Sequence, residues 1–440
     1  MAMVVKNNMS ALSTLNTLNK NTKALSKSLQ KVSSGMKINS AADDASGYAI
    51  SERMRVQIRS LDQANSNAQN GGSMMKVAEG AVSSTVEILK TLKEKAVNAA
   101  NDTNTDADRQ TIQKELDQSI DQINDNANVT FNGQYLVDGS KNGATDATST
   151  ALTNQSLGTG TAKSTALTSL TARNGDKLNI QVTDKVTVSW VKDGKTFSCS
   201  MEVGSKTTLS SVFNTLDDSN GKKLSAYINI KENGPKITVD GSGNTVYTAS
   251  GESGLTLVAG GAGIEGQISG FTISITDNTG AVRKSANAAL DAFDETLRAQ
   301  NKSEDNSINL QIGTKANQTI KVGLTDMKAQ ALGLQGANNN TIQVGNQKQA
   351  NAAINVLDAA IQKALDQQTT IGAVQSRLEY TQSNLTTASE NVTAAESTIR
   401  DADMAKEMTE YTKNNVLMQA AQSMLAQANQ SSSNVLSLLQ

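Results

Sequence analysis

The stretch Ile354–Ala402 decides the fold of this chain. Its apolar residues recur alternately three and four positions apart, at Ile354, Leu357, Ile361, Ala364, Ile371, Val374, Leu378, Leu385, Ala388, Val392, Ala395, Ile399 and Ala402. This heptad spacing is typical of a helix that packs in a left-handed supercoil. Only Gly372 interrupts the run and no proline occurs in it. We therefore expect a helix of roughly fifty residues, about 75 Å long.

A single helix of this kind would expose its apolar stripe, and the other end of the chain supplies a partner. The first stripe there consists of Val5, Met9, Leu12, Leu15, Leu18, Leu25, Leu29, Val32 and Met36. It ends near Gly35, a residue that commonly terminates helices. A second helix is expected after the cap residues Asp43 and Asp44, and a third from Ala107 to about Asn126. The pattern predicts a long antiparallel helical rod and a coiled coil, each formed by both chain ends.

The middle of the chain has a different character. From about Ser140 the sequence becomes rich in Thr, Ser, Gly and Asn, and helical periodicity disappears. Alternating runs predict strands at Lys177–Val182, Lys185–Val191, Ser225–Ile230, Lys236–Val239 and Gly270–Ile275, with hairpins at Phe131–Leu136 and Ile308–Val322. A short helix is expected at about Thr208–Leu216. The predicted fold class is therefore mainly α, with an inserted β-rich region of one or two domains.

Composition agrees with an elongated molecule. The chain has 440 residues, yet only 3% are aromatic and 37% hydrophobic, which is little for one large compact core. The 40 basic and 42 acidic residues are interspersed, so we expect neither nucleic acid nor a membrane as partner. No run of eighteen apolar residues occurs, and the N-terminal residues lack the apolar core of a cleaved signal. Export would require a route without a cleaved signal.

The residue inventory argues against an enzyme. Without histidine the chain has no Ser-His-Asp arrangement and no zinc-binding His-Glu-x-x-His helix. The string Gly204–Thr207 resembles part of a phosphate loop, but Cys199 stands where that motif needs glycine. The acidic groups at Asp43-Asp44 and Arg400–Asp403 are interpreted as helix caps and breaks. Cys199 is interpreted as a small structural residue. We expect no catalytic, cofactor-binding or metal-binding residues.

The two ends of the chain resemble bacterial flagellin. The resemblance rests on Asn7–Leu12, Leu29–Asn39 and Ala41–Ile50, and at the far end on Ala395–Asp403, Leu425–Gln430 and Asn434–Leu439. It covers roughly residues 1–140 and 305–440. The family implies inner coiled-coil segments at 1–43 and 404–440, rod segments at 44–140 and 301–403, and variable outer β-rich domains at 141–300.

The resemblance implies a structural subunit that self-assembles into the filament of the bacterial flagellum for swimming motility. The chain would be secreted through the flagellar type III apparatus, with an export chaperone, a filament cap protein and hook–filament junction proteins as partners. We expect residues 1–40 and 404–440 to be disordered in the monomer and to order on polymerisation. Met404, Met408, Met418 and Met424 are expected to be exposed for contacts between subunits. The predicted assembly residues are Val5, Met9, Leu12, Leu15, Leu18, Leu25, Leu29, Val32, Met404, Met408, Met418, Leu425, Val435, Leu436, Leu438 and Leu439.

The family also implies recognition by innate immune receptors. The stretch read by the cell-surface Toll-like receptor for flagellin corresponds here to Leu89, Thr91, Glu94, Lys95, Val97 and Glu115. Strongly stimulating relatives carry Arg at the position of Thr91 and Leu at that of Lys95, so we expect weakened signalling. Val435, Leu436, Leu438 and Leu439 match the pattern read by cytosolic sensors.

Three alternatives stay open. A hook–filament junction protein would share these termini. Some flagellins carry a zinc peptidase in the middle domain, although the absence of histidine argues against one here. Ser and Thr enrichment in residues 140–280 fits O-linked glycosylation and solvated strand edges equally well.

Overall fold

The computed structural model describes residues 8–217, 221–240, 243–248 and 251–438, and leaves the side chains at 232–233, 432 and 434–438 undescribed. The chain divides into two compact units. The first comprises Met1–Ala68, Gln311–Gln318 and Tyr380–Gln440, and the second Gln69–Leu310 and Thr319–Glu379. Two helices, α2 (Ala45–Ala99) and α6 (Gln347–Arg400), contribute residues to both units.

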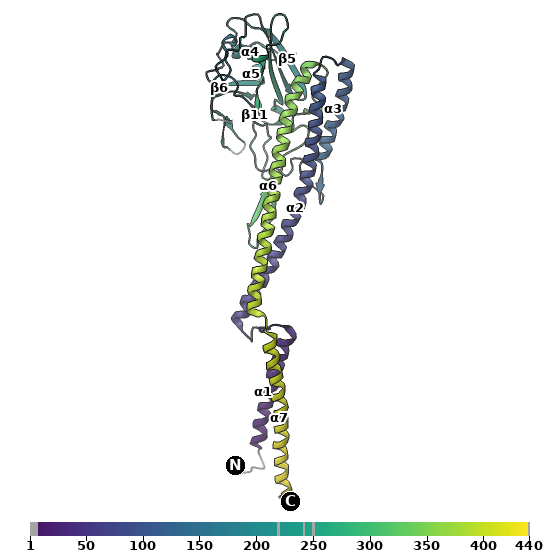
Figure 1. Cartoon of the computed structure of the whole chain (residues 1–440), viewed down its shortest axis with the longest axis vertical. Helices are drawn as coiled ribbons and strands as arrows, with labels where there is room; N and C mark the ends of the chain where they lie inside the picture. Colours follow the sequence, from purple (N-terminus) through teal and green to yellow (C-terminus); the bar gives the residue numbers. More distant parts are fainter. Residues whose placement is uncertain (1–7, 218–220, 241–242, 249–250, 439–440) are drawn as a thin grey trace. The chain divides into compact units, whose positions relative to one another are not determined.

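In the first unit the two chain ends lie side by side. Helix α1 (Met9–Ser34) packs along α7 (Met404–Leu438), as Figure 1 shows. Helix α1 ends at Gly35, whose φ of 69° is left-handed and whose N–H donates to the Lys31 carbonyl at 2.9 Å. Glycine adopts this conformation without the steric cost that a Cβ would add, which is why the helix stops here.

A junction built around Arg400 holds the segments after α1 and before α7 together. The Lys37 N–H donates to the Arg400 carbonyl at 2.8 Å, and the Ala402 N–H to the Gly35 carbonyl at 2.9 Å. The Arg400 side chain is only 7% exposed, and its guanidinium lies 2.7 Å from a Glu52 carboxylate oxygen. The same group contacts the Met36 sulfur at 3.1 Å and covers the Tyr48 ring. One buried cation thus ties three separate segments of the unit together.

The acidic residues near the junction are helix caps, as predicted. Asp44 accepts hydrogen bonds from the Ser46 and Gly47 N–H groups at 3.0 Å, at the start of α2. Asp403 accepts from the N–H groups of Ala405 and Lys406 at the start of α7. These bonds satisfy donors that a helix start leaves without a partner.

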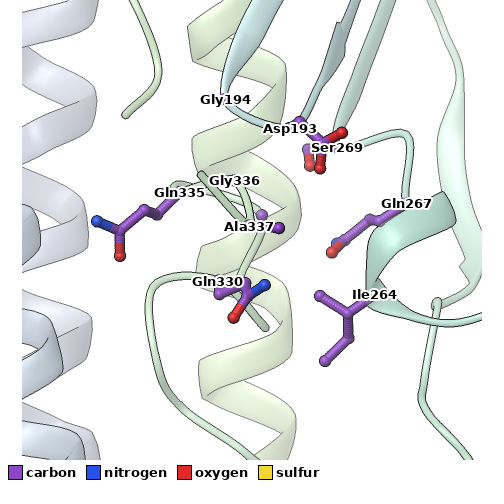
Figure 2. A pocket seen from close by; sticks show the side chains of 10 residues that line it. Asp193, Gly194, Ile264, Gln267, Ser269, Gln330, Gln335, Gly336 and Ala337 are labelled. Carbon is purple, nitrogen blue, oxygen red and sulfur yellow. The ribbon is translucent and has the colours of Figure 1, made fainter. Parts of the chain in front are cut away.

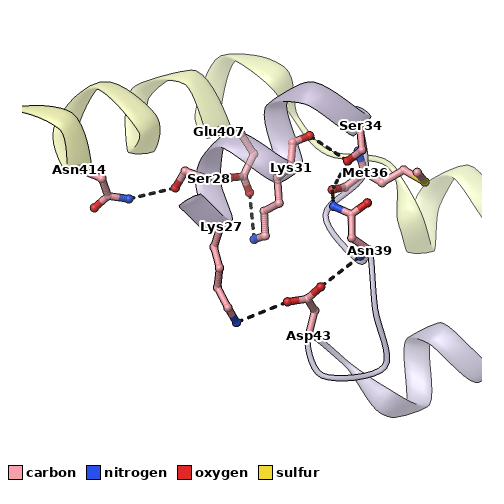
Figure 3. A network of polar contacts seen from close by, with 9 residues as sticks. All are labelled: Lys27, Ser28, Lys31, Ser34, Met36, Asn39, Asp43, Glu407 and Asn414. Atoms are coloured by element: carbon pink, nitrogen blue, oxygen red, sulfur yellow. Dashed lines mark hydrogen bonds and ion pairs between the residues drawn. The ribbon is translucent and has the colours of Figure 1, made fainter. Parts of the chain in front are cut away.

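Asp43 stabilises the turn between α1 and α2. Burial acts to raise the pKa of Asp43, but hydrogen bonds from Ser40 and Asn39 outweigh it and hold the pKa below its usual value. Figure 3 shows Asp43 between Asn39 and the ammonium of Lys27.

In the second unit α2, α3 (Asp106–Ala127) and α6 pack through apolar faces. The Gln375 amide donates to the Glu79 carboxylate at 2.7 Å, and Lys93 pairs with Asp358, so α2 and α6 run antiparallel. Positions seven residues apart on α6 are almost fully buried, at Leu357, Ala364, Ile371 and Leu378. The heptad prediction is confirmed for this stretch, whereas farther along the predicted stripe Ala395 is exposed and Ala402 lies beyond the end of α6.

The described residues of the β-rich region, 141–300, contain a four-stranded and a three-stranded antiparallel sheet, besides a two-stranded hairpin. The four-stranded sheet has the strand order β11-β3-β9-β6 and the three-stranded sheet β10-β4-β5. The strands are β3 (Ala151–Asn154), β4 (Lys185–Lys192), β5 (Lys195–Glu202), β6 (Ile228–Gly234), β9 (Gly254–Ala259), β10 (Gly270–Thr276) and β11 (Asp294–Leu297). The short hairpins are β1 (Thr130–Phe131) with β2 (Gln134–Tyr135), β7 (Lys236–Val239) with β8 (Thr245–Tyr247), and β12 (Ile308–Gln311) with β13 (Thr319–Val322).

One hydrophobic core joins both sheets and the helices α4 (Leu209–Thr215) and α5 (Lys284–Leu290). Trp190 and Phe271 are its largest fully buried side chains, and Phe271 meets Phe293 edge to face at 5.2 Å. Cys199 on β5 packs partly buried against this core, consistent with a structural residue.

The β-rich region is joined to the helical part of the second unit by close backbone contacts. Figure 2 shows the β4–β5 turn at Asp193 and Gly194 beside Gly336. A Cβ at Gly194 would clash with the backbone oxygen of Asn340, and one at Gly336 with that of Asp193. At the start of β10, a Cβ at Gly270 would lie 2.7 Å from a methyl group of Val356 on α6. Glycine at these places lets two layers approach more closely than any side chain permits.

Most predicted elements are confirmed, and two strand predictions are corrected. Lys177–Val182 is not a strand, because Asn179 has a φ of 51° and the Leu178 N–H donates to Leu170 instead of to a strand partner. In the predicted strand Ser225–Ile230, residues up to Ala226 form a 3-10 turn, and β6 begins at Ile228. Helix α5 was not predicted.

Replacing Arg400 by Gln should loosen the junction selectively. The loss of the cation removes the ion pair to Glu52 and leaves Met36 and Tyr48 without their shared partner. We expect amide hydrogen exchange in residues 35–48 to quicken by roughly tenfold, as for loss of a well-formed charged hydrogen bond. The matched control is Arg55→Gln, because Arg55 pairs with the same Glu52 carboxylate at 3.3 Å from an exposed position. Equal effects of both variants would contradict the assigned role of Arg400.

Candidate functional site

Helices α1 and α7 meet along a seam whose residues recur three and four positions apart. On α1 the seam consists of Ala11, Thr14, Leu18, Asn21, Leu25, Ser28 and Val32, and on α7 of Glu407, Tyr411, Asn414, Met418, Ala421, Leu425 and Ala428. Among these only Ser28 and Ala421 are buried, and the others are half-buried. The spacing is that of a coiled coil, but two helices alone leave its seam partly exposed.

Polar contacts set the register of this antiparallel pair. The Asn21 amide donates to the Leu417 carbonyl at 3.2 Å. Figure 3 shows the Asn414 amide donating to the Ser28 hydroxyl, and Lys31 paired with Glu407 at 3.3 Å. Because half-exposed ion pairs contribute little to stability, these bonds specify alignment more than they hold the pair together.

A second set of apolar side chains on the same two helices is exposed to solvent, each to between 41% and 68%. The exposed fractions are 68% for Met9, 52% for Leu12, 41% for Leu15 and 51% for Leu29 on α1, and 44% for Met404, 45% for Met408, 59% for Val416, 43% for Leu417 and 61% for Met424 on α7. We call these nine residues the uncovered terminal face. By helical spacing, Met404 and Met408 lie on the opposite side of the α7 seam from Leu417 and Met424, so these residues are spread around α7 and one partner helix cannot cover them all.

The predicted assembly residues divide between the seam and the uncovered terminal face. Leu18, Leu25, Val32, Met418 and Leu425 lie in the seam, so the expectation that Met418 is exposed is wrong. Met9, Leu12, Leu15, Leu29, Met404 and Met408 lie on the uncovered terminal face.

Five of the predicted assembly residues cannot be assigned to either surface. Val5 and Leu439 lie outside the described residues. Val435, Leu436 and Leu438 lie within α7, but their side chains are not described.

The sequence prediction missed Val416 and Leu417 among the exposed residues. The sequence feature that could have revealed them is their position: Val416 and Leu417 lie between Asn414 and Met418, which already occupy the seam positions of this turn. A wheel drawn from the seam residues would have placed both outside it.

The predicted receptor residues lie on α2, except Glu115, which lies on α3. Thr91, Glu94 and Glu115 are exposed, as is Val97 at 51%. Leu89 is fully buried, so its prediction as a direct contact is corrected: it is a core residue beneath that surface. The Lys95 ammonium lies 2.9 Å from a Glu115 carboxylate oxygen.

The described residues contain no group of three Cys, Asp or Glu side chains arranged to hold a metal ion. Within the same residues, no helix combines the length and the apolar character that crossing a bilayer requires.

Comparisons with known proteins agree with these observations. Residues 5–142 match the model of the bacterial flagellin N-terminal helical region, and residues 354–439 that of the flagellin C-terminal helical region. Flagellin of Clostridium tyrobutyricum is 36% identical over 97% of this chain and 99% of its own length. Flagellin of Bacillus subtilis (strain 168) is 32% identical over 99% of this chain and all of its own length.

Among solved structures, flagellar hook associated protein-3 of Legionella pneumophila aligns with 78% of this chain and 97% of its own, at 13% identity and a TM-score of 0.34. That similarity is too low to bear on function. The identity to full-length relatives and the matches at both ends lead to one conclusion: the chain belongs to the bacterial flagellin family.

Proposed function

We propose that the chain polymerises into the flagellar filament through the uncovered terminal face, which becomes buried against α1 and α7 of neighbouring copies. Membership of the flagellin family supports a structural subunit of that filament. The observation that carries the finer proposal is the exposure of Met9, Leu12 and Leu15 beside a seam that α7 already occupies.

The physical reason is that each helix presents more apolar surface than one partner helix can cover. Fully burying a Leu or Met side chain contributes about 1.5–3 kcal/mol. In the single chain these residues keep much of their area in water, and further copies would remove it. Methionine suits such a surface because its flexible side chain adapts to a partner's shape.

The same proposal assigns each segment of the chain to a layer of the filament. Residues 1–43 and 404–440 would form the inner coiled coil of the filament, and 44–140 with 301–403 the rod around it. Residues 141–300 would form the outward-facing part. The long heptads of α2 and α6 and the separate hydrophobic core of the β-rich region support this division.

The further partners are those that an exported filament subunit requires. We propose an export chaperone that covers the C-terminal helix before assembly, a filament cap protein that guides insertion, and junction proteins at the filament base. The exposed Met404, Met408 and Met424 on α7 support the need for such cover during transit. The proposed location is the filament outside the cell, reached without a cleaved signal.

Placing a charge on the uncovered terminal face should block assembly. Leu12→Asp would force a carboxylate into an apolar contact between subunits, which costs several kcal/mol. We expect the monomer concentration needed for growth from short filament seeds to rise more than tenfold, scored by negative-stain electron microscopy.

The matched control is Ser13→Asp, which adds the same charge at the adjacent exposed position. It should retain assembly. Normal filaments from Leu12→Asp would refute the assigned surface, and failure of the unaltered chain to grow on seeds would favour a hook–filament junction protein.

A second proposal concerns the innate receptor, for which the carrying observation is the Lys95–Glu115 ion pair. We propose that the chain is a weak ligand of the cell-surface Toll-like receptor for flagellin. The ion pair with Lys95 occupies the Glu115 carboxylate, which the receptor would otherwise contact. Thr91 cannot provide the guanidinium that strongly stimulating relatives have at this position.

Introducing the arginine and the leucine that strongly stimulating relatives carry at positions 91 and 95 should therefore strengthen signalling. The double variant Thr91→Arg with Lys95→Leu should lower the dose for half-maximal response in receptor-bearing reporter cells by at least about tenfold, a gain of about 1.4 kcal/mol. Lys90→Leu on the same helix turn is the control, because Lys90 pairs with Glu87 instead. An unchanged dose response of the double variant would contradict the proposal.

A further inference from the structure

Strand β11 of the β-rich region meets helix α6 through charged side chains. Arg298, just after β11, lies 2.8 Å from the Asp366 carboxylate on α6. Glu295 on β11 and Lys363 on α6 lie in the same cluster, with the Glu295 side chain 11% exposed and Lys363 9% exposed. All of these residues belong to the second unit.

Glu295 is poorly prepared to carry a negative charge. Its side chain is 11% exposed, and its Oε1 atom has no hydrogen-bond partner among the described residues. Its other oxygen lies 3.8 Å from the Nε of Arg298, beyond hydrogen-bonding distance. A buried carboxylate without hydrogen bonds is costly when ionised and much less so when protonated.

The charged groups that face Glu295 are Arg298 and Lys363, and Asp326 lies near Lys363. Lys363, 9% exposed, donates from its ammonium to the Ala331 carbonyl at 2.6 Å. Asp326, in the segment after β13, accepts from the Lys328 N–H at 2.9 Å and also faces Asp138. Two cations, Arg298 and Lys363, therefore face Glu295, but neither forms a hydrogen bond to it.

The pKa values of Glu295, Lys363 and Asp326 are shifted in the directions that this burial predicts. Burial raises the pKa of Glu295 to about 7, an increase that Arg298 and Lys363 only partly offset. Burial lowers the pKa of Lys363 to about 8, partly offset by Glu295 and Asp326. Burial also raises the pKa of Asp326. The cluster thus changes its protonation close to neutral pH, where ordinary carboxyl and amino groups do not.

We propose that the contact between β11 and α6 is a proton-controlled latch, closed when Glu295 is protonated and opened locally when Glu295 ionises. A groove of about 480 Å³, lined by Glu295, Arg298 and Asp366, lies beside the cluster and gives water a path to the ionised carboxylate. Opening lets this carboxylate be solvated, at the expense of the β11–α6 contact.

The opening is local because two other contacts between the β-rich region and the helical part, both described in the structure, carry no charge. Figure 2 shows Gly194 near Gly336. The close backbone approach of Gly194 to Asn340 does not depend on pH. Neither does the packing of Gly270 against Val356. Protonation therefore regulates how firmly one edge of the β-rich region is held, without detaching the whole.

The sign of the pH dependence follows from linkage. A carboxyl group whose pKa is higher in the closed state than in the open state favours the closed state at low pH. This stabilisation is lost as the pH rises from the ordinary glutamate pKa of 4.5 to the closed-state pKa of about 7. Lys363 acts in the opposite direction, but chiefly above pH 8. Between pH 5.5 and 7.5 the opening equilibrium should rise by about tenfold, because the Glu295 effect dominates there.

Hydrogen exchange on the full-length monomer tests the latch. Protection of amides in peptides covering residues 291–298 and 360–367 would be measured at pH 5.5 and 7.5, after correction for the intrinsic pH dependence of exchange. We expect protection in the unaltered chain to fall by about tenfold. Glu295→Gln, which mimics the protonated side chain, should keep high protection at both pH values. Asp294→Asn, at the exposed neighbouring position, is the control and should behave like the unaltered chain.

Direct titration of Glu295 in the unaltered chain keeps the test independent of the variant. A side-chain carboxyl resonance assigned to Glu295 by carbon-13 NMR should titrate with a midpoint near 7. A midpoint near the ordinary value of 4.5 would overturn the proposal. Protection that is independent of pH in the unaltered chain, or pH dependence retained by Glu295→Gln, would also overturn it.

Discussion

The antiparallel pairing of helices from the two chain ends is the constraint on which the rest of this molecule depends. Helices α1 and α7 pair with each other, and α2 pairs with α6, so the N-terminal and C-terminal segments return along one another. A helix of 54 residues such as α6 could not keep its apolar stripe in water without such a partner. The β-rich region can therefore only be an insertion between the two arms.

The two helical pairs differ in how completely they bury their stripes. On α6 the heptad row from Leu357 to Leu378 is at most 1% exposed, because α2, α3 and the loop segments supply a full set of neighbours. On α1 the seam contains Thr14, Asn21 and Ser28, and the larger side chains of Leu12 and Leu15 lie outside it. The part of the chain with an incomplete core is the part that self-assembly would complete. Within the first unit, Arg400 joins the segment after α1 to the beginning of α2.

The helices could be predicted because their period is long and regular. Seven-residue repeats on α6 and the glycine at position 35 define the length and end of their elements without reference to anything else. The β-rich region was harder to predict. Leu178 and Ile180 alternate with polar residues as in a strand, and both are buried, but the left-handed φ of Asn179 turns the backbone out of any ladder. Helix α5 was missed because its seven residues make too few turns for a period and Arg283 provides no side-chain cap.

The candidate site could be predicted only as a set of apolar residues. The periodicity identified Leu12, Leu25 and Met418 alike, but which of them faces α7 and which faces outward depends on a crossing that only the structure supplies. Leu89 illustrates the same limit, since its position in the motif gives no sign that it points into the core. The Glu295–Lys363 cluster has no sequence signal, because its members lie far apart in the chain and meet only through the docking of β11 on α6.

The central claim is that the terminal helices acquire their full burial from neighbouring copies. Amide hydrogen exchange of α1 and α7, measured on the monomer and on the assembled filament, tests it most directly. The account predicts rapid exchange in both helices of the monomer and strong protection in the filament, with little change at the buried row of α6. Equal protection of α1 and α7 in both states would contradict it, because the helices would then be complete within a single chain.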